Sequence, residues 1–463
     1  MLHETKYGVA MDTLIISVSG VRGIVGESFH PNLLARFGTA FGTFIKAGKV
    51  VLGRDSRPSG EMAWHALLSG LIATGCEVVD LGICPTPTIL LRAKDLSAGG
   101  SITITASHNP IEWNGIEFAA SCGSLLTPEQ SAELINIYEN YKDKLMPHDK
   151  LGSVKQDDTA VERHISKILN LPYIDVELIK NRRLKVVIDC CNGAGSVISP
   201  KLLRELGCEV IELGCQPDGK FPRHPEPVPE HLSQLCEIVR AQNADIGFAH
   251  DGDADRLAIV SDKAEAISNE YTLVLASDFI LSKRKGPVVA TSSTSMMMDY
   301  IAQKHGVPLY RTKVGVGNVV QKMQKVNAVI GGEGTGGVIF PEIHYTTDGM
   351  TALAVIIQQL AESKATISEL VSEIPQYSII KKKIEIPTQE IADALTHKAA
   401  QYYANENINL TDGVKIIRKD SWVNIRKSGT EPVIRVFSEA KTTEEAERLC
   451  DSTMEMIKSW MRA

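Results

Sequence analysis

Residues 49–82 read KVVLGRDSRPSGEMAWHALLSGLIATGCEVVDLG, and this stretch decides the fold class. Its β-branched start predicts a strand that runs into a loop. Residues 61–75 place Ala63, Leu67 and Leu71 at helical spacing, and CEVVDLG (76–82) predicts a second strand. A strand–helix–strand unit pairs its strands in parallel through a right-handed crossover by default. The stretch therefore predicts an α/β domain.

Two further copies of this unit follow along the chain. The second begins at KVVIDCCNGAGS (185–196) and ends at CEVIELG (208–214), which repeats the pattern of CEVVDLG. The third begins at PVVATSSTS (287–295) and ends at VPLYRTKVG (307–315). From EIPQYSIIKKKIEIP (373–387) onward the pattern mixes helices and strands. The sequence thus predicts an α/β fold of three tandem similar α/β domains with mixed sheets, plus a smaller C-terminal α+β domain.

Composition narrows the class of protein. At 463 residues the chain is too long for one hydrophobic core, and its 43% apolar and 23% charged residues are ordinary for a globular protein. A net charge of −7 argues against nucleic acid or an anionic membrane as partner. The sequence predicts no membrane span and no signal peptide. Nine cysteines without a CxxC pair indicate reduced thiols and a cytoplasmic location.

The first candidate motif is SITITASHNP (101–110), in which a hydroxyl, an imidazole and an amide follow a predicted strand. Ser107 is either a nucleophile, which needs help from a base or a metal, or a turn residue that ends the strand. His108 is adjacent in sequence, which alone does not decide between the two.

The second motif, AHDGDADRLAIV (249–260), alternates Asp251, Asp253 and Asp255 between two predicted strands. Three carboxylates in a tight loop repel one another unless a cation lies among them, and oxygen ligands favour Mg²⁺ or Ca²⁺. An EF-hand does not fit, because Arg256 stands at the sixth position and Asp262 at the twelfth. The alternative is a solvated acidic turn.

Two glycine-containing loops complete the set. In VIGGEGTGGVIF (329–340), glycines flank Glu333 and Thr335, whose side chains suit sugar hydroxyls. NIRKSGTEPVIRVFSEA (424–440) gathers guanidinium groups, hydroxyls and a turn that together suit a phosphate group. The candidate phosphate-binding residues are Arg426, Ser428, Gly429, Thr430 and Arg435. Ordinary surface turns are the alternative for both loops.

With these four motifs in this order, the chain resembles the α-D-phosphohexomutase superfamily, which includes phosphoglucomutase, phosphomannomutase and phosphoglucosamine mutase. The resemblance runs from SGVRGIVG (19–26) to the C-terminal phosphate loop. It implies four domains around a central active-site cleft, with one motif from each domain. The expected domains cover residues 1–153 with the phosphoserine loop, 154–262 with the metal loop, 263–375 with the sugar loop and 376–463 with the phosphate loop.

The resemblance also implies roles for the motif residues. Ser107 would be phosphorylated, and it would hold one Mg²⁺ together with the three aspartates. The enzyme would interconvert hexose 1-phosphates and 6-phosphates through a hexose 1,6-bisphosphate, which also serves as activator. Arg22 in GVRG and His108 match active-site positions, Lys313 in TKVG matches a substrate-loop position, and Arg256 would orient the carboxylates or face the phosphoserine.

Two departures from the family pattern bear on mechanism and substrate. In NPIEWNGIEF, Glu117 stands where many members have a lysine that is a proposed general acid/base, so Glu117 is a candidate proton carrier. In GGEGTGG, Gly337 replaces a histidine, a form that favours glucosamine phosphate over glucose or mannose phosphate. A metal-dependent sugar phosphatase and a sugar-phosphate-binding protein remain as alternatives from other classes. The expected partners are small hexose phosphates, with the chain as a monomer or homodimer.

Overall fold

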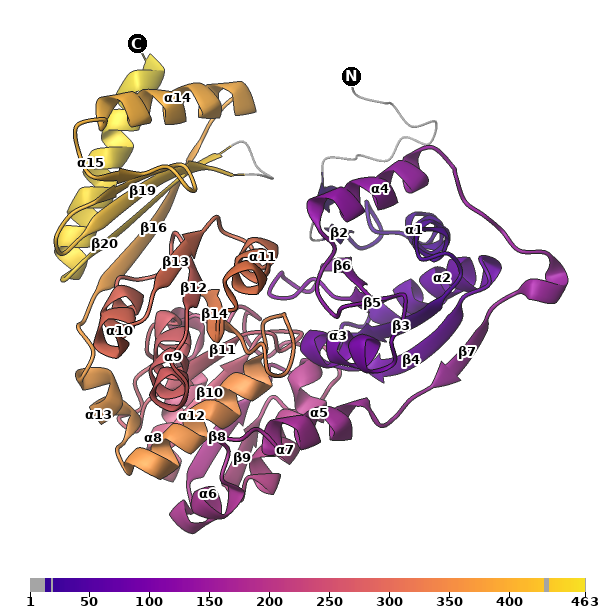
Figure 1. Ribbon diagram of the computed structural model, residues 1–463, viewed down its shortest axis with the longest axis horizontal. Helices are drawn as coiled ribbons and strands as arrows, with labels where there is room; N and C mark the ends of the chain where they lie inside the picture. Colours follow the sequence, from indigo (N-terminus) through magenta and orange to yellow (C-terminus); the bar gives the residue numbers. More distant parts are fainter. Residues whose placement is uncertain (1–12, 18–19, 429–432, 463) are drawn as a thin grey trace. The chain divides into compact units, whose positions relative to one another are not determined.

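The computed structural model describes residues 13–17, 20–428 and 433–462 (Figure 1). The chain forms two compact units, one from residues 1–272 and 336–368 and the other from residues 273–335 and 369–463. No helix in the described part of the chain combines the length and the apolarity that crossing a membrane requires.

The first unit begins with a mixed seven-stranded sheet in the order β1-β2-β6-β5-β3-β4-β7. Its strands are β1 (Ile15–Ser17), β2 (Gly20–Ile24), β3 (Lys49–Arg54), β4 (Glu77–Ile83), β5 (Gly100–Ile104), β6 (Trp113–Ala120) and β7 (Ser153–Gln156). Its helices are α1 (Pro31–Phe44), α2 (Gly60–Ala73), α3 (Thr86–Asp95) and α4 (Pro128–Glu139). Strands β3 and β5 are parallel neighbours, with Arg54 opposite Ile104. The loops that follow these two strands therefore lie side by side at the carboxyl edge of the sheet.

The predicted strand–helix–strand unit at residues 49–82 is confirmed as β3, α2 and β4. Helix α2 packs on α1, and its side chains Ala63, Leu67 and Leu71 are fully buried. A methyl group added at Gly70 would lie 2.3 Å from the Ala35 carbonyl oxygen, so glycine permits this close approach of the two helices.

A four-stranded sheet follows in the same unit, in the order β11-β10-β8-β9. Its strands are β8 (Lys185–Asp189), β9 (Glu209–Leu213), β10 (Ile246–His250) and β11 (Leu257–Val260). Its helices are α5 (Ala160–Leu169), α6 (Val176–Arg182), α7 (Ser199–Glu205) and α8 (Ser233–Gln242). Strands β10 and β11 are antiparallel, with His250 opposite Leu257, so the six residues between them form a tight loop. Helix α12 (Gly349–Ser363) also belongs to this unit and contacts β11, α6 and α7.

The second unit contains three parallel strands and an antiparallel sheet. The parallel strands β12 (Val288–Thr291), β13 (Leu309–Thr312) and β14 (Ile330–Glu333) accompany α10 (Met297–His305) and α11 (Val316–Val326). The antiparallel sheet, in the order β16-β20-β19-β18-β17, consists of β16 (Ser378–Glu385), β17 (Ile408–Asn409), β18 (Val414–Ile417), β19 (Trp422–Lys427) and β20 (Val433–Ala440). Helices α14 (Gln389–Tyr402) and α15 (Thr443–Arg462) pack on this sheet.

Three further elements lie at the junctions between the units along the chain: α9 (Glu270–Lys283), β15 (Gly337–Ile339) and α13 (Ile367–Ser372). The predicted fold class, three α/β domains followed by a smaller α+β domain, is confirmed. The expected domain boundaries stay predictions.

Candidate active site

Ser107 lies in the loop that follows β5, where its backbone adopts the left-handed conformation with φ of 49°. The residue is 5% exposed. Its hydroxyl donates to Asp251 Oδ2 over 3.0 Å and lies 3.2 Å from His108 Nδ1. Because left-handed backbone is unfavourable for any residue with a side chain, surrounding contacts must hold this loop in place.

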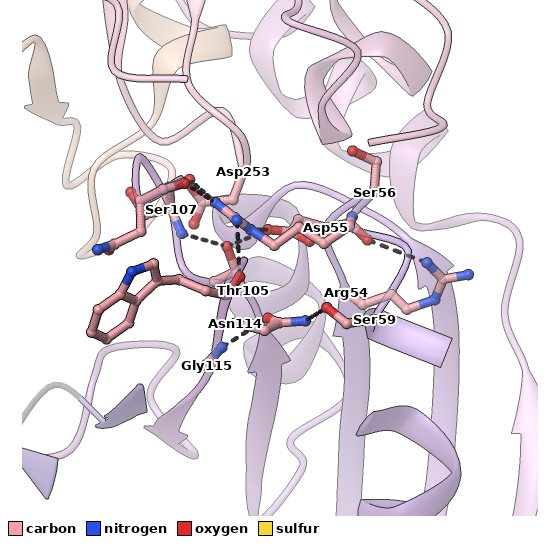
Figure 2. A network of polar contacts seen from close by, with 12 residues as sticks. Arg54, Asp55, Ser56, Ser59, Thr105, Ser107, Asn114, Gly115 and Asp253 are labelled. Carbon is pink, nitrogen blue, oxygen red and sulfur yellow. Dashed lines mark hydrogen bonds and ion pairs between the residues drawn. The ribbon is translucent and has the colours of Figure 1, made fainter. Parts of the chain in front are cut away.

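A buried polar network beneath the loop supplies those contacts (Figure 2). Thr105 Oγ1 donates to Asp55 Oδ2 over 2.7 Å and accepts the Ser107 N–H over 2.8 Å. Arg57 is fully buried, and its Nε donates to Asp55 Oδ2 over 3.1 Å. The remaining guanidinium hydrogens go to backbone carbonyl oxygens: Nη2 lies 2.9 Å from Ser107 O and 2.6 Å from Asn109 O, and Nη1 lies 2.7 Å from Pro110 O and 3.0 Å from Trp113 O.

The three predicted metal ligands come together in the tight loop between β10 and β11. One ligand oxygen from each of Asp251, Asp253 and Asp255 lies within 4.8 Å of the others. Thr86 Oγ1 donates to Asp253 Oδ2 over 2.6 Å, and Thr347 Oγ1 donates to Asp255 Oδ2 over 2.8 Å. These contacts fix the Oδ2 atoms of Asp253 and Asp255 and leave their Oδ1 atoms without these hydrogen bonds.

The carboxylates of this loop fit a hard divalent cation. Asp253 Oδ1 and Asp255 Oδ1 are both buried, and neither has a hydrogen-bond partner among the described residues. Burial together with the Asp255 charge raises the pKa of Asp253 to about 6, and burial with the charges of Asp255 and Asp253 raises the pKa of Asp251. A bound cation would relieve this repulsion, Asp251, Asp253 and Asp255 are the residues that could hold it, and an all-oxygen donor set suits Mg²⁺.

The metal loop and the serine loop touch through backbone. A methyl group added at Gly252 would lie 2.7 Å from the Ser107 carbonyl oxygen, so glycine is required for this contact. Ala254 adopts a left-handed conformation with φ of 59° in the same loop. The spacing between the serine hydroxyl and the three carboxylates therefore depends on both backbones.

A second acidic group lies behind the metal loop and is satisfied by hydrogen bonds. Asp348 Oδ2 lies 3.0 Å from His164 Nε2 and 3.1 Å from His344 Nε2, and it accepts the Thr351 hydroxyl. Asp348 Oδ1 accepts the Met350 and Thr351 N–H groups and so caps helix α12. Five hydrogen bonds account for this carboxylate without a metal. The cluster anchors the residue next to Thr347.

Arg22 and Glu117 form an ion pair on neighbouring strands β2 and β6. Arg22 Nη2 donates to Glu117 Oε1 over 2.9 Å, and Arg22 Nη1 donates to Asn109 Oδ1 over 3.1 Å. Burial raises the pKa of Glu117 to about 7, against the opposing effect of Arg22. The carboxyl can therefore gain or lose a proton near neutral pH, which is the property a proton carrier needs.

The other two predicted residues of this site flank the same loops. Burial and the charges of Arg256 and Arg22 lower the pKa of His108 to about 2, so its imidazole is neutral at physiological pH. Arg256 Nε lies 3.9 Å from both Asp251 Oδ2 and Asp255 Oδ1, and its backbone N–H donates to Asp251 Oδ1 over 3.3 Å. Arg256 thus supplies a positive charge beside two of the three carboxylates.

The sugar-loop candidates lie in the second unit. Glu333 ends β14, and its Oε1 accepts the Gly315 N–H over 2.9 Å, which ties it to the segment that begins at Lys313. Lys313 is exposed, and Thr335 is half-buried just beyond the strand. The structure thus brings Glu333 next to the lysine loop.

The predicted phosphate loop connects β19 and β20 in the second unit. Arg426 and Arg435 stand directly opposite each other on these strands, and Arg426 Nε is buried without a hydrogen-bond partner in the described structure. Like charges in directly opposite positions destabilise a sheet, and the Asp412 and Glu333 carboxylates act on Arg426 in the opposite sense. Ser428 is buried at the start of the turn. Gly429 and Thr430 lie outside the described residues.

Sequence reasoning missed several residues that shape the site. Asp55 and Arg57 follow β3 in GRDSR, and a charged pair immediately after a buried strand was a usable signal. Thr105 lay within the quoted SITITASHNP. Thr86 and Thr347 come from distant segments, and no local pattern marks them.

Comparisons with known proteins bear on all four domains. Family models described as phosphoglucomutase/phosphomannomutase match residues 14–145 (alpha/beta/alpha domain I), 162–264 (domain II), 268–377 (domain III) and 381–456 (C-terminal domain).

Full-length relatives give the same result. A "Phosphoglucomutase/phosphomannomutase" of Thermococcus kodakarensis is 40% identical over 452 residues, covering 96% of this chain and 98% of the relative. A "Probable phosphoglucosamine mutase" of Methanopyrus kandleri is 38% identical over 448 residues, covering 95% and 97%. A crystal structure of a phosphoglucomutase/phosphomannomutase family protein from Burkholderia thailandensis superimposes with a TM-score of 0.83 at 27% identity, covering 96% of this chain and 98% of the other.

The acidic loop makes a testable prediction about metal binding that does not depend on activity. Chelator-treated protein should bind one Mg²⁺ in a calorimetric titration. Asp253→Asn should weaken binding by more than about tenfold, since losing even the outer partners of a metal site costs that much. Asp262→Asn is the matched control, because Asp262 lies just beyond β11 and accepts hydrogen bonds from Ser368. Equal affinity in wild type and Asp253→Asn would contradict the assignment.

Proposed function

Since this chain belongs to the phosphoglucomutase/phosphomannomutase family, with matches along all four domains, we propose that it is a phosphohexomutase that moves a phosphoryl group between O1 and O6 of a hexose. The observation that carries the proposal is the 3.0 Å contact between the Ser107 hydroxyl and Asp251. It places a nucleophile against a cluster of carboxylates with two unsatisfied oxygens. A metal-dependent phosphotransfer centre needs that combination.

The proposed reaction has two balanced phosphoryl transfers. Phosphorylated Ser107 donates its phosphoryl group to the free hydroxyl of a hexose monophosphate, so that one O–P bond breaks as another forms and the sugar hydroxyl gives up its proton. The product is a hexose 1,6-bisphosphate. After reorientation, the bisphosphate returns its other phosphoryl group to Ser107, and the isomeric monophosphate leaves with its proton restored. Added 1,6-bisphosphate would activate enzyme that has lost its phosphate.

The acidic loop would hold one Mg²⁺ through Asp251, Asp253 and Asp255, with Ser107 as a further oxygen ligand. When bound, Mg²⁺ supplies positive charge that neutralises the phosphoryl oxygens. The chain itself fixes the serine hydroxyl, excludes water by burying it, and places the Arg256 guanidinium beside the carboxylates. These are the demands of phosphoryl transfer, which needs positioning and charge neutralisation more than covalent chemistry.

Glu117 is the proposed proton carrier. Its pKa of about 7 lets it accept the proton of the sugar hydroxyl and return it later in the cycle. Arg22, paired with Glu117 and with Asn109 in the serine loop, would keep the carboxyl oriented. His108 is neutral and contacts the serine hydroxyl, so it would orient that hydroxyl.

Glucosamine phosphate is the proposed substrate. The GGEGTGG loop and the relatives named probable phosphoglucosamine mutase support it. In the second unit, Glu333, Thr335 and Lys313 would contact the sugar, and the phosphate loop would bind a phosphate group of the substrate through Arg426, Ser428, Gly429, Thr430 and Arg435. Glucose and mannose phosphates are the alternative substrates. A cytoplasmic location and a monomeric or homodimeric state remain predictions.

A substrate panel tests the proposed function. Purified enzyme with Mg²⁺ is given glucosamine, glucose and mannose 1-phosphates, and the products are resolved by ³¹P NMR. We expect 6-phosphate isomers, with glucosamine phosphate turned over fastest, and no turnover by Ser107→Ala. Release of inorganic phosphate without isomer would identify a phosphatase instead, and full turnover by Ser107→Ala would exclude the phosphoserine mechanism.

Glu117 makes a separate prediction about pH. A base must be ionised to accept a proton, so wild-type kcat/KM should fall as the pH drops below about 7, the folded-state pKa of Glu117. Glu117→Gln should lower kcat by about 10²–10⁴-fold and abolish this limb of the profile. Glu112→Gln is the control, because Glu112 is exposed just before β6, the strand that carries Glu117. An unchanged pH profile in Glu117→Gln would show that another group carries the proton.

A further inference from the structure

The polar network beneath the serine loop consists of residues that contact neither sugar nor phosphate in the proposed reaction. We infer that Asp55, Arg57 and Thr105 form a positioning unit that sets Ser107 for phosphoryl transfer. This inference rests on the proposed function. It extends that function to residues that are not among the candidate catalytic or ligand-binding residues of the four motifs. Its basis is that the unit forms hydrogen bonds with both the N–H group and the carbonyl oxygen of Ser107.

Thr105 forms the hydrogen bond with the Ser107 N–H. A threonine hydroxyl has one hydrogen, which goes to Asp55 Oδ2, so its lone pairs are free to accept the Ser107 N–H. The carboxylate therefore orients the hydroxyl as an acceptor (Figure 2). Asp55 is itself fixed, since its Oδ1 accepts the Arg57 N–H over 2.9 Å and its own N–H donates to Ile104 O over 2.9 Å.

Arg57 forms the hydrogen bond with the Ser107 carbonyl oxygen. A guanidinium has five N–H hydrogens, and here all five reach acceptors: one on Asp55 and four backbone carbonyl oxygens between Ser107 and Trp113. The carbonyls extend from the serine loop to the first residue of β6, so one rigid planar group spans the loop. The Phe221 ring lies 5.0 Å from the guanidinium carbon. A lysine at this position has only three donors and cannot reproduce the pattern.

The geometry links the hydrogen bond between Arg57 and Ser107 to the metal loop. The Ser107 carbonyl that Arg57 binds is also the atom that Gly252 approaches. Fixing that peptide group thus fixes the left-handed turn at Ser107 and the separation of its hydroxyl from Asp251. Because a small misplacement of a reacting group can cost about 100-fold in rate, the unit acts on the rate of transfer more than on substrate binding.

The chain offers a matched control on β5, the strand that precedes Thr105. Thr103 stands two residues before Thr105, is 1% exposed, and its hydroxyl has no hydrogen-bond partner among the described residues. Replacing either threonine by valine keeps size and branching at a buried site. Only the change at residue 105 removes a contact with Ser107.

The experiment compares four variants by steady-state kinetics and thermal unfolding of the full chain. We expect Thr105→Val to lower kcat by about 100-fold while KM stays within about threefold, because the groups that bind substrate are untouched. Thr105→Ser keeps the hydroxyl and should restore activity. Thr103→Val should match wild type. Arg57→Lys should behave as Thr105→Val although it keeps the charge.

Each outcome decides between roles. Equal kcat in Thr105→Val and Thr103→Val would overturn the inference, and so would full activity in Arg57→Lys, which would reduce the role of Arg57 to its charge. If Thr105→Val loses its folded state, the comparison of Arg57→Lys with Thr105→Ser still decides. Absence of turnover in the wild type would overturn the proposed function and this inference together.

Discussion

The contact between the Ser107 hydroxyl and Asp251 joins two loops that are 144 residues apart in sequence, and the chemistry of the site depends on it. Each loop is unfavourable by itself. The first needs a left-handed serine, and the second brings three carboxylates, two of them buried, within 4.8 Å of one another. Hydrogen bonds from distant segments offset the first cost, and a divalent cation would offset the second. The features that are costly for folding are thus the ones that serve phosphoryl transfer.

Charge at the site is arranged in pairs, with one exception. Arg57 is paired with Asp55, and Arg22 with Glu117. Beside the three aspartates, the Arg256 guanidinium lies 3.9 Å from Asp251 and from Asp255, and its single charge does not balance three carboxylates. In the second unit, Arg426 stands opposite Arg435 on neighbouring strands, and the Asp412 and Glu333 carboxylates act on Arg426 from nearby.

The sequence was sufficient for the main architecture, while the roles of the candidate site residues stay predictions. Periodicity predicted the strand–helix–strand units, and alternating aspartates predicted a clustered acidic loop, because both are local patterns. The supporting residues were not predictable in this way. Arg57 is fully buried, against the usual preference of arginine for the surface, and its burial is explained by the Asp55 carboxylate together with the carbonyl groups of a folded loop. Thr86 and Thr347 reach Asp253 and Asp255 only through tertiary packing.

The central claim is that Ser107 itself carries the phosphoryl group between the two positions of the sugar. Transfer of label tests it most directly: dephosphorylated enzyme with Mg²⁺ is mixed with ³²P-labelled glucosamine 1,6-bisphosphate, quenched and digested, and the labelled peptide is sequenced. The account predicts label on Ser107, released again when unlabelled glucosamine 6-phosphate is added. Label on another residue, or no label while the enzyme turns over, would contradict it.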